Sequence, residues 1–90
     1  MGETDRPDPL APLRTRFLAR AADDLAWIEA GGTPQDELLV RVHKLAGIAG
    51  TFGYAEVSQV AAALEDDLRE GRAADLRPLI SALRALASPS

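Results

Sequence analysis

The stretch LLVRVHKLAGIAGTF, residues 38–52, decides the fold class of this 90-residue chain. Its apolar side chains recur three and four residues apart, which is the spacing of one face of an α-helix. The residues that form this apolar stripe are Leu38, Val42, Leu45, Ala49 and Phe52. Such a helix cannot bury its stripe alone, so the rest of the chain has to supply further helices or a sheet to cover it.

Glycine and proline divide the remaining sequence into three more segments of the same kind. We expect residues 1–8 to form a flexible tail and residues 9–88 to form a single helical domain. The first helix opens near Asp8-Pro9 or Ala11-Pro12 and ends at Gly31-Gly32. In the second helix Thr33 is the expected N-cap and Pro34 the first helical residue, and Gly53 ends the pattern. A third helix runs from about residue 55 to 70. Asp75 caps a fourth, which stops at residues 88–90.

Each of these three segments carries its own apolar stripe. The first-helix stripe leaves charged residues outside it, namely Arg16, Arg20, Asp23 and Asp24. The stripes consist of Leu10, Leu13, Phe17, Leu18, Ala21, Leu25 and Ile28 in the first helix, Val57, Val60, Ala61, Leu64 and Leu68 in the third, and Leu76, Leu79, Ile80, Leu83 and Leu86 in the fourth. Alanine and leucine dominate the composition, while β-branched and aromatic residues are few. The sequence therefore predicts an all-α, antiparallel up-down four-helix bundle.

Composition excludes several classes of function. The chain has no cysteine and one histidine, so a cysteine-ligated metal, a thiolate nucleophile and a multi-imidazole site are excluded, and we expect no metal site. The net charge of −4 argues against nucleic-acid binding. No apolar run is long enough for a membrane span or a signal core, so we expect a cytoplasmic protein without membrane association.

The surroundings of the single histidine, His43, are unusual for a helix. Gly47 and Gly50 follow it inside the helical pattern, and each costs roughly 1 kcal/mol relative to alanine. On a helical wheel centred on the apolar stripe, His43 lies about 140° from the core direction, Gly47 about 180° and Gly50 about 120°. Glycines kept for close packing within the bundle would face the core. The pattern instead indicates an exposed imidazole left open to approach by another molecule, although an isolated exposed histidine is usually just solvated.

The segment HKLAGIAGTFGY, residues 43–54, resembles the phosphoacceptor motif of histidine-containing phosphotransfer (HPt) domains. It is particularly similar to the version found in the phosphoacceptor domain of chemotaxis histidine kinases. The histidine, the glycine four residues later, the Ala-Gly pair and the final Phe-Gly all match. Together with the four-helix pattern, the resemblance covers about residues 10–87. It implies that His43 accepts a phosphoryl group on Nε2.

The resemblance also bears on the groups around His43. A glutamate on the following helix hydrogen-bonds the histidine in the chemotaxis version, and Glu65 occupies the matching position. An antiparallel third helix independently brings residues 63–66 alongside His43, although Glu65 could instead be a solvated member of the acidic run 65–67. The family usually has lysine three residues after the histidine, where this chain has Ala46. Lys44 can replace that charge only in part, because it points in another direction.

The implied function is that of a bacterial phosphorelay carrier without kinase activity of its own. It would exchange phosphoryl groups with the aspartate of a receiver domain in a response regulator or hybrid kinase, or take them from a histidine kinase catalytic domain. We expect docking on Val40, Lys44, Gly47 and Gly50, with the required Mg²⁺ bound by the receiver. The Met1 start and the early stop favour a complete small protein, which we expect to be monomeric. The alternative function is that of a helical adaptor that keeps the bundle without phosphotransfer.

Overall fold

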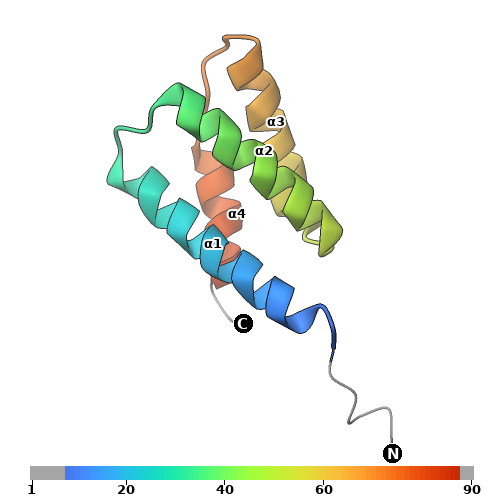
Figure 1. The fold of residues 1–90 in the computed structure, drawn as a ribbon. Helices are drawn as coiled ribbons and strands as arrows, with labels where there is room; N and C mark the ends of the chain where they lie inside the picture. Colours follow the sequence, from blue (N-terminus) through green and yellow to red (C-terminus); the bar gives the residue numbers. More distant parts are fainter. Residues whose placement is uncertain (1–7, 88–90) are drawn as a thin grey trace, which may run out of the picture.

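The structure, a computed structural model, describes residues 8–87 of the chain (Figure 1). The tail expected at residues 1–8 therefore falls almost wholly outside the described residues. The helix stop expected at residues 88–90 also lies outside them.

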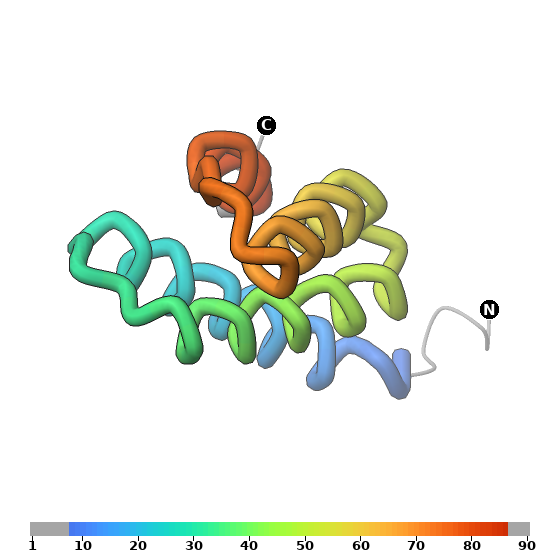
Figure 2. Tube along the Cα trace, turned by 90° about the horizontal axis from the view of Figure 1, so that it is seen from above, coloured from blue at the N-terminus to red at the C-terminus, as the bar shows by residue number. Residues whose placement is uncertain are grey.

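Four helices make up the described part of the chain. They are α1 (Ala11–Ala30), α2 (Gln35–Thr51), α3 (Ala55–Arg69) and α4 (Arg77–Ala87). Consecutive helices run in opposite directions, and their order around the bundle follows their order in the sequence (Figures 1 and 2). The predicted all-α four-helix bundle is confirmed.

The end of α2 illustrates how the sequence sets a helix boundary. Gly53 has a φ of 82°, a left-handed conformation that side chains other than glycine rarely adopt. This turn lets the amide of Tyr54 donate a hydrogen bond of 2.8 Å to the carbonyl of Ala49, and Gly53 donates to Gly50. Carbonyls that the helix would otherwise leave unpaired are thus satisfied, so the glycine ends α2 where the sequence predicts.

The predicted N-caps are only partly correct. Asp75 accepts a hydrogen bond from the amide of Arg77, the first residue of α4, so it pairs a free amide at this end as expected, although Leu76 stands between it and the helix. Thr33 does not cap α2, because the helix begins one residue later than predicted, at Gln35, with Pro34 as an extended cap residue. Near that end the carboxylate of Asp36 accepts a hydrogen bond from the amide of Glu37.

The core runs along the inner faces of all four helices. The interface between α2 and α3 is the most extensive in the bundle, and that between α1 and α2 is the smallest.

At the end of the bundle where α2 meets the start of α1, the ring of Phe17 stacks on that of Tyr54, with 5.4 Å between the ring centroids. The centroid of the Phe52 ring lies 5.9 Å from that of Phe17. The buried apolar residues are Phe17, Ala21, Ile28, Leu38, Val42, Leu45, Ala49, Val57, Ala61, Leu64, Leu79, Ala82 and Leu83.

The predicted stripe of α1 needs correction. Leu10, Leu13 and Leu18 are exposed rather than buried. Asp24, which was expected to avoid the core, is buried with 1% of its surface exposed. The reason is that α1 contacts α2 over a small area, so its first turns project past the bundle, while a charged partner on α2 makes burial of Asp24 possible.

That partner is Arg41. Its Nη1 donates a 2.6 Å hydrogen bond to Oδ1 of Asp24, and its guanidinium lies 4.1 Å from the ring centroid of Trp27 on α1. Glu37 holds the guanidinium from the solvent side. Burial raises the pKa of Asp24, and the hydrogen bond from Arg41 opposes this effect. The ion pair and the cation–π contact together tie α1 to α2 where few apolar contacts do so.

We expect Arg41→Met to lower the free energy of unfolding by about 3 kcal/mol, because it leaves a buried carboxylate without its partner. Chemical denaturation followed by circular dichroism measures this. Arg16→Met, at an exposed arginine of α1, is the matched control and should change stability by less than about 0.5 kcal/mol. A loss no larger in Arg41→Met than in the control would show that the ion pair does not hold α1.

Candidate functional site

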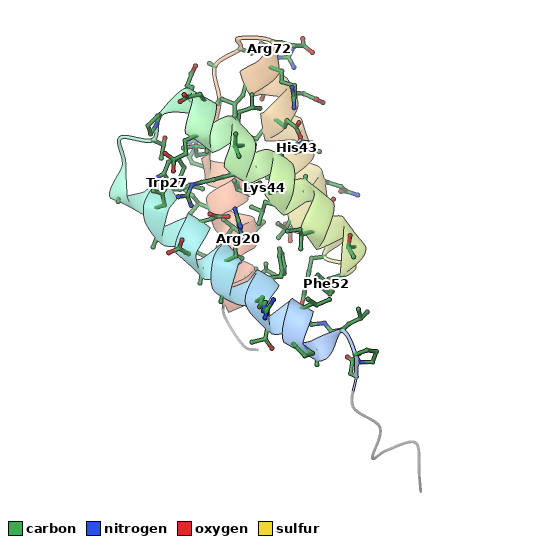
Figure 3. All side chains as sticks on the ribbon, in the orientation of Figure 1. Arg20, Trp27, His43, Lys44, Phe52 and Arg72 are labelled. Carbon is green, nitrogen blue, oxygen red and sulfur yellow. The ribbon has the colours of Figure 1, made fainter. Side chains whose placement is uncertain are left out.

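His43 lies on α2, on the side that faces α3 (Figure 3). Its side chain is 65% exposed, yet its Nδ1 lies 2.8 Å from Oε2 of Glu65 on α3. The interaction bridges two helices and joins residues that are 22 positions apart in the sequence. The histidine is thus accessible and held at one nitrogen.

Glu65 provides the fixed end of this contact. Its side chain is only 14% exposed, and Oε2 also accepts hydrogen bonds from Nε and Nη2 of Arg69, at 2.9 and 2.7 Å. Arg69 follows one helical turn later on α3, the spacing at which a glutamate and an arginine meet. The structure therefore brings Glu65 to His43, as the antiparallel arrangement predicts, rather than leaving it solvated.

The ionisation of Glu65 decides how the histidine is protonated. The hydrogen bonds from Arg69 lower the pKa of Glu65, His43 lowers it further, and burial opposes both. An ionised carboxylate can only accept, so in a neutral imidazole Nδ1 carries the proton. Nε2 then holds a free lone pair, and no hydrogen bond joins this atom to another of the described residues.

The two glycines after His43 differ from each other. A Cβ at Gly47 would meet nothing within 4 Å, so this position is open as expected. At Gly50 a Cβ would lie 3.2 Å from Oγ of Ser58, whose hydroxyl donates to the carbonyl of Ala46. Gly50 is exposed, as expected of a residue that faces away from the core, but it also lies against Ser58 and so allows α3 to approach α2 closely.

The remaining predicted residues lie on the exposed side of α2. Val40 is 52% exposed, and Lys44 is exposed without a salt bridge to any carboxylate between residues 8 and 87 (Figure 3). Ala46, where the family has lysine, is half-buried beside α3. Lys44 therefore forms no salt bridge with Glu65, the carboxylate that contacts the imidazole.

Sequence reasoning missed Arg69 and Ser58. Arg69 carries an available signal, because it stands four residues after a glutamate on the same helix. Ser58 carries none, since its bond to a carbonyl on α2 depends on how closely two helices pack.

The site is a surface rather than an enclosed pocket. The described residues contain no group of three or more side chains suited to hold a metal ion. A surface groove of about 370 Å³ lies on the other side of α2, between α1 and α2, lined by Leu13, Arg16, Phe17, Arg20, Ile48, Thr51 and Phe52. Within residues 8–87 no helix combines the length and apolar character that a membrane crossing requires.

Comparison with known protein families gives one match. The family model described as Hpt domain matches residues 12–88, which is most of the chain and includes all of α2 and α3. No curated protein and no solved structure gives a significant match.

The two glycines generate a stability prediction. Gly47→Ala should raise the free energy of unfolding by up to about 1 kcal/mol, because alanine favours the helix and its methyl group meets no neighbour. Gly50→Ala should gain less or lose stability, because Ser58 has to move. Chemical denaturation of both variants measures the difference. Equal gains would mean that Gly50 has no packing role.

Proposed function

The chain belongs to the Hpt domain family, whose members are phosphotransfer modules of two-component systems, and on this premise we propose that His43 is its phosphoacceptor. The family consists of phosphocarriers that work with receiver domains or kinases. For this chain we propose exchange of a phosphoryl group between Nε2 of His43 and the aspartate of a receiver domain.

The observation that carries the proposal is the state of the imidazole. Glu65 occupies Nδ1 at 2.8 Å, while more than half of the histidine side chain stays open to solvent. A neutral imidazole nitrogen is a competent nucleophile near neutral pH, because the reference pKa of histidine is about 6.5. The arrangement favours the tautomer in which the accessible Nε2 is the nucleophile.

Phosphoryl transfer forms one bond to phosphorus and breaks another. The lone pair of Nε2 forms a bond to phosphorus while the bond between phosphorus and the aspartyl oxygen breaks, and that oxygen leaves with the electron pair. Nδ1 keeps its proton, so positive charge develops on the ring, and the carboxylate of Glu65 stabilises it. The reverse step returns the group to aspartate. The receiver supplies the Mg²⁺ that neutralises charge on the phosphoryl oxygens.

The docking surface we propose is the exposed side of α2 around His43. Gly47 forms its open centre, Val40 adds an exposed apolar side chain, and Lys44 adds a positive charge that no carboxylate of residues 8–87 pairs with. Gly50 belongs to this surface only at its edge, because Ser58 lies against it. The contact area would be small, which suits a carrier that has to release its partner.

Replacing the acceptor tests the function. His43→Gln should abolish phosphoryl acceptance from a phosphorylated receiver while the helical circular dichroism spectrum stays unchanged, because the exposed side chain contributes little to the core. Labelled phosphate on the wild-type protein should be acid-labile and base-stable, as a phosphoramidate is. Equal labelling of variant and wild type would refute the assignment. Absence of labelling in both, with every donor, would support the adaptor alternative.

The docking surface has a separate test. Gly47→Leu should slow transfer from a receiver about tenfold or more by crowding the approach to His43, although the helix itself gains propensity. Transfer from the small donor phosphoramidate should change much less, because it needs no protein docking. Ser81→Leu, on an exposed position of α4, a helix that does not contact α2 among the described residues, is the control. Unchanged transfer from the receiver would place the docking surface elsewhere.

A further inference from the structure

One carboxylate oxygen of Glu65 contacts nitrogen atoms of two other residues, His43 and Arg69. Oε2 of Glu65 lies 2.8 Å from Nδ1 of His43 and accepts hydrogen bonds from Nε and Nη2 of Arg69. Two helices meet at this atom, because His43 lies on α2 and both other residues lie on α3. The orientation of the imidazole therefore depends on a carboxylate that is itself held by an arginine.

The arginine is suited to hold this carboxylate still. A guanidinium is planar and presents its N–H donors in a fixed fork, so two bonds to one oxygen restrain the carboxylate more than a single flexible donor would. The side chain of Arg69 is 54% exposed, and Glu65 is the carboxylate with which it forms a salt bridge among the described residues. Its two hydrogen bonds go to the same oxygen that contacts His43.

Ala46 stands where the family usually has a lysine. A lysine three residues after the histidine would bring a positive charge to the site, and alanine brings none. Lys44 lies towards the opposite side of α2 and forms no salt bridge with Glu65. Arg69, on α3, brings a positive charge to Glu65, the carboxylate that contacts the imidazole.

We propose that Arg69 is a positioning residue for the phosphoacceptor histidine, acting through Glu65 to keep the Nδ1-protonated tautomer and so leave Nε2 free. The proposal rests on the function proposed above. It assigns to Arg69 no contact with the phosphoryl group. The lowered pKa of Glu65, for which the hydrogen bonds from Arg69 are the main cause, agrees with this role.

Without Arg69, the carboxylate of Glu65 can turn about its side-chain torsions, and its bond to Nδ1 is no longer held in one geometry. The imidazole would then populate the Nε2-protonated tautomer more often. In that tautomer the accessible nitrogen has no lone pair for attack, so phosphorylation slows in proportion to the population lost.

The chain offers a matched control in Arg72. This arginine lies just beyond α3, is 53% exposed and pairs with Asp67 and Glu70 rather than with Glu65. Arg69→Gln and Arg72→Gln remove the same charge from the same end of the bundle. A difference between them therefore reports the contact with Glu65 and not the net charge.

The first measurement is the tautomer of His43 by ¹⁵N NMR of the whole protein. Because the chain has one histidine, the ring-nitrogen resonances need no residue assignment, and Nδ1 and Nε2 are told apart by their couplings to Hε1 and Hδ2. At about pH 8.5, well above the reference pKa of about 6.5, we expect the Nδ1-protonated form to predominate in wild type and Arg72→Gln. Arg69→Gln and Glu65→Gln should shift towards the Nε2-protonated form, and Arg69→Lys should restore part of the wild-type spectrum.

The second measurement is the rate of phosphorylation by phosphoramidate, a donor that needs no docking. Nε2 bonds to phosphorus while the phosphorus–nitrogen bond of the N-protonated donor breaks, and neutral ammonia leaves with the electron pair. We expect Arg69→Gln to be about two- to fivefold slower than wild type, as suits an exposed ion pair, and Arg72→Gln to match wild type.

Identical tautomer spectra and rates in the two glutamine variants would overturn the role of Arg69. Equal changes in both would also overturn it, because they would show an effect of net charge. If wild type accepts no phosphoryl group from any donor, the proposed function fails. The NMR comparison still decides whether Arg69 sets the tautomer, since it needs no phosphoryl chemistry.

Discussion

The close packing of α2 against α3 is the constraint on which the site depends. Ala49 and Ala61 are fully buried, and the glycine at position 50 leaves room for Ser58, which hydrogen-bonds the backbone of α2. Small side chains shorten the distance between two helices. This approach brings a mostly buried glutamate within hydrogen-bond distance of a histidine whose ring remains exposed.

The resulting site separates two requirements of a phosphoryl carrier. Orientation comes from the side of α2 that faces α3, where Glu65 and Arg69 form a charged pair beside Nδ1. Access comes from the opposite, solvent-facing side, where Gly47 has no side chain. The described residues form no group of three or more side chains suited to hold a metal ion.

A different interaction holds α1 in place. The apolar contact between α1 and α2 is small, and the ion pair of Asp24 and Arg41, stacked on Trp27, joins the two helices near the loop between them. The aromatic group of Phe17, Phe52 and Tyr54 does so at the opposite end. Phe17 and Phe52 also line the groove between α1 and α2, which His43 does not line.

The sequence by itself determined the four helices, their approximate ends and the exposure of His43, because these depend on local periodicity, on glycine and proline, and on the position of a residue within one helix. It also placed Glu65 near His43, since antiparallel neighbours have a predictable register. Only the tertiary structure decided which side chains of the first helical segment are buried, since Asp24 is buried while Leu10, Leu13 and Leu18 are exposed. It also decided that Gly50 lies against Ser58 and that Arg69 donates hydrogen bonds to Glu65. Burial of a charge and the fit of a glycine depend on which residue of another helix lies opposite, and a single helical pattern carries no information about that partner.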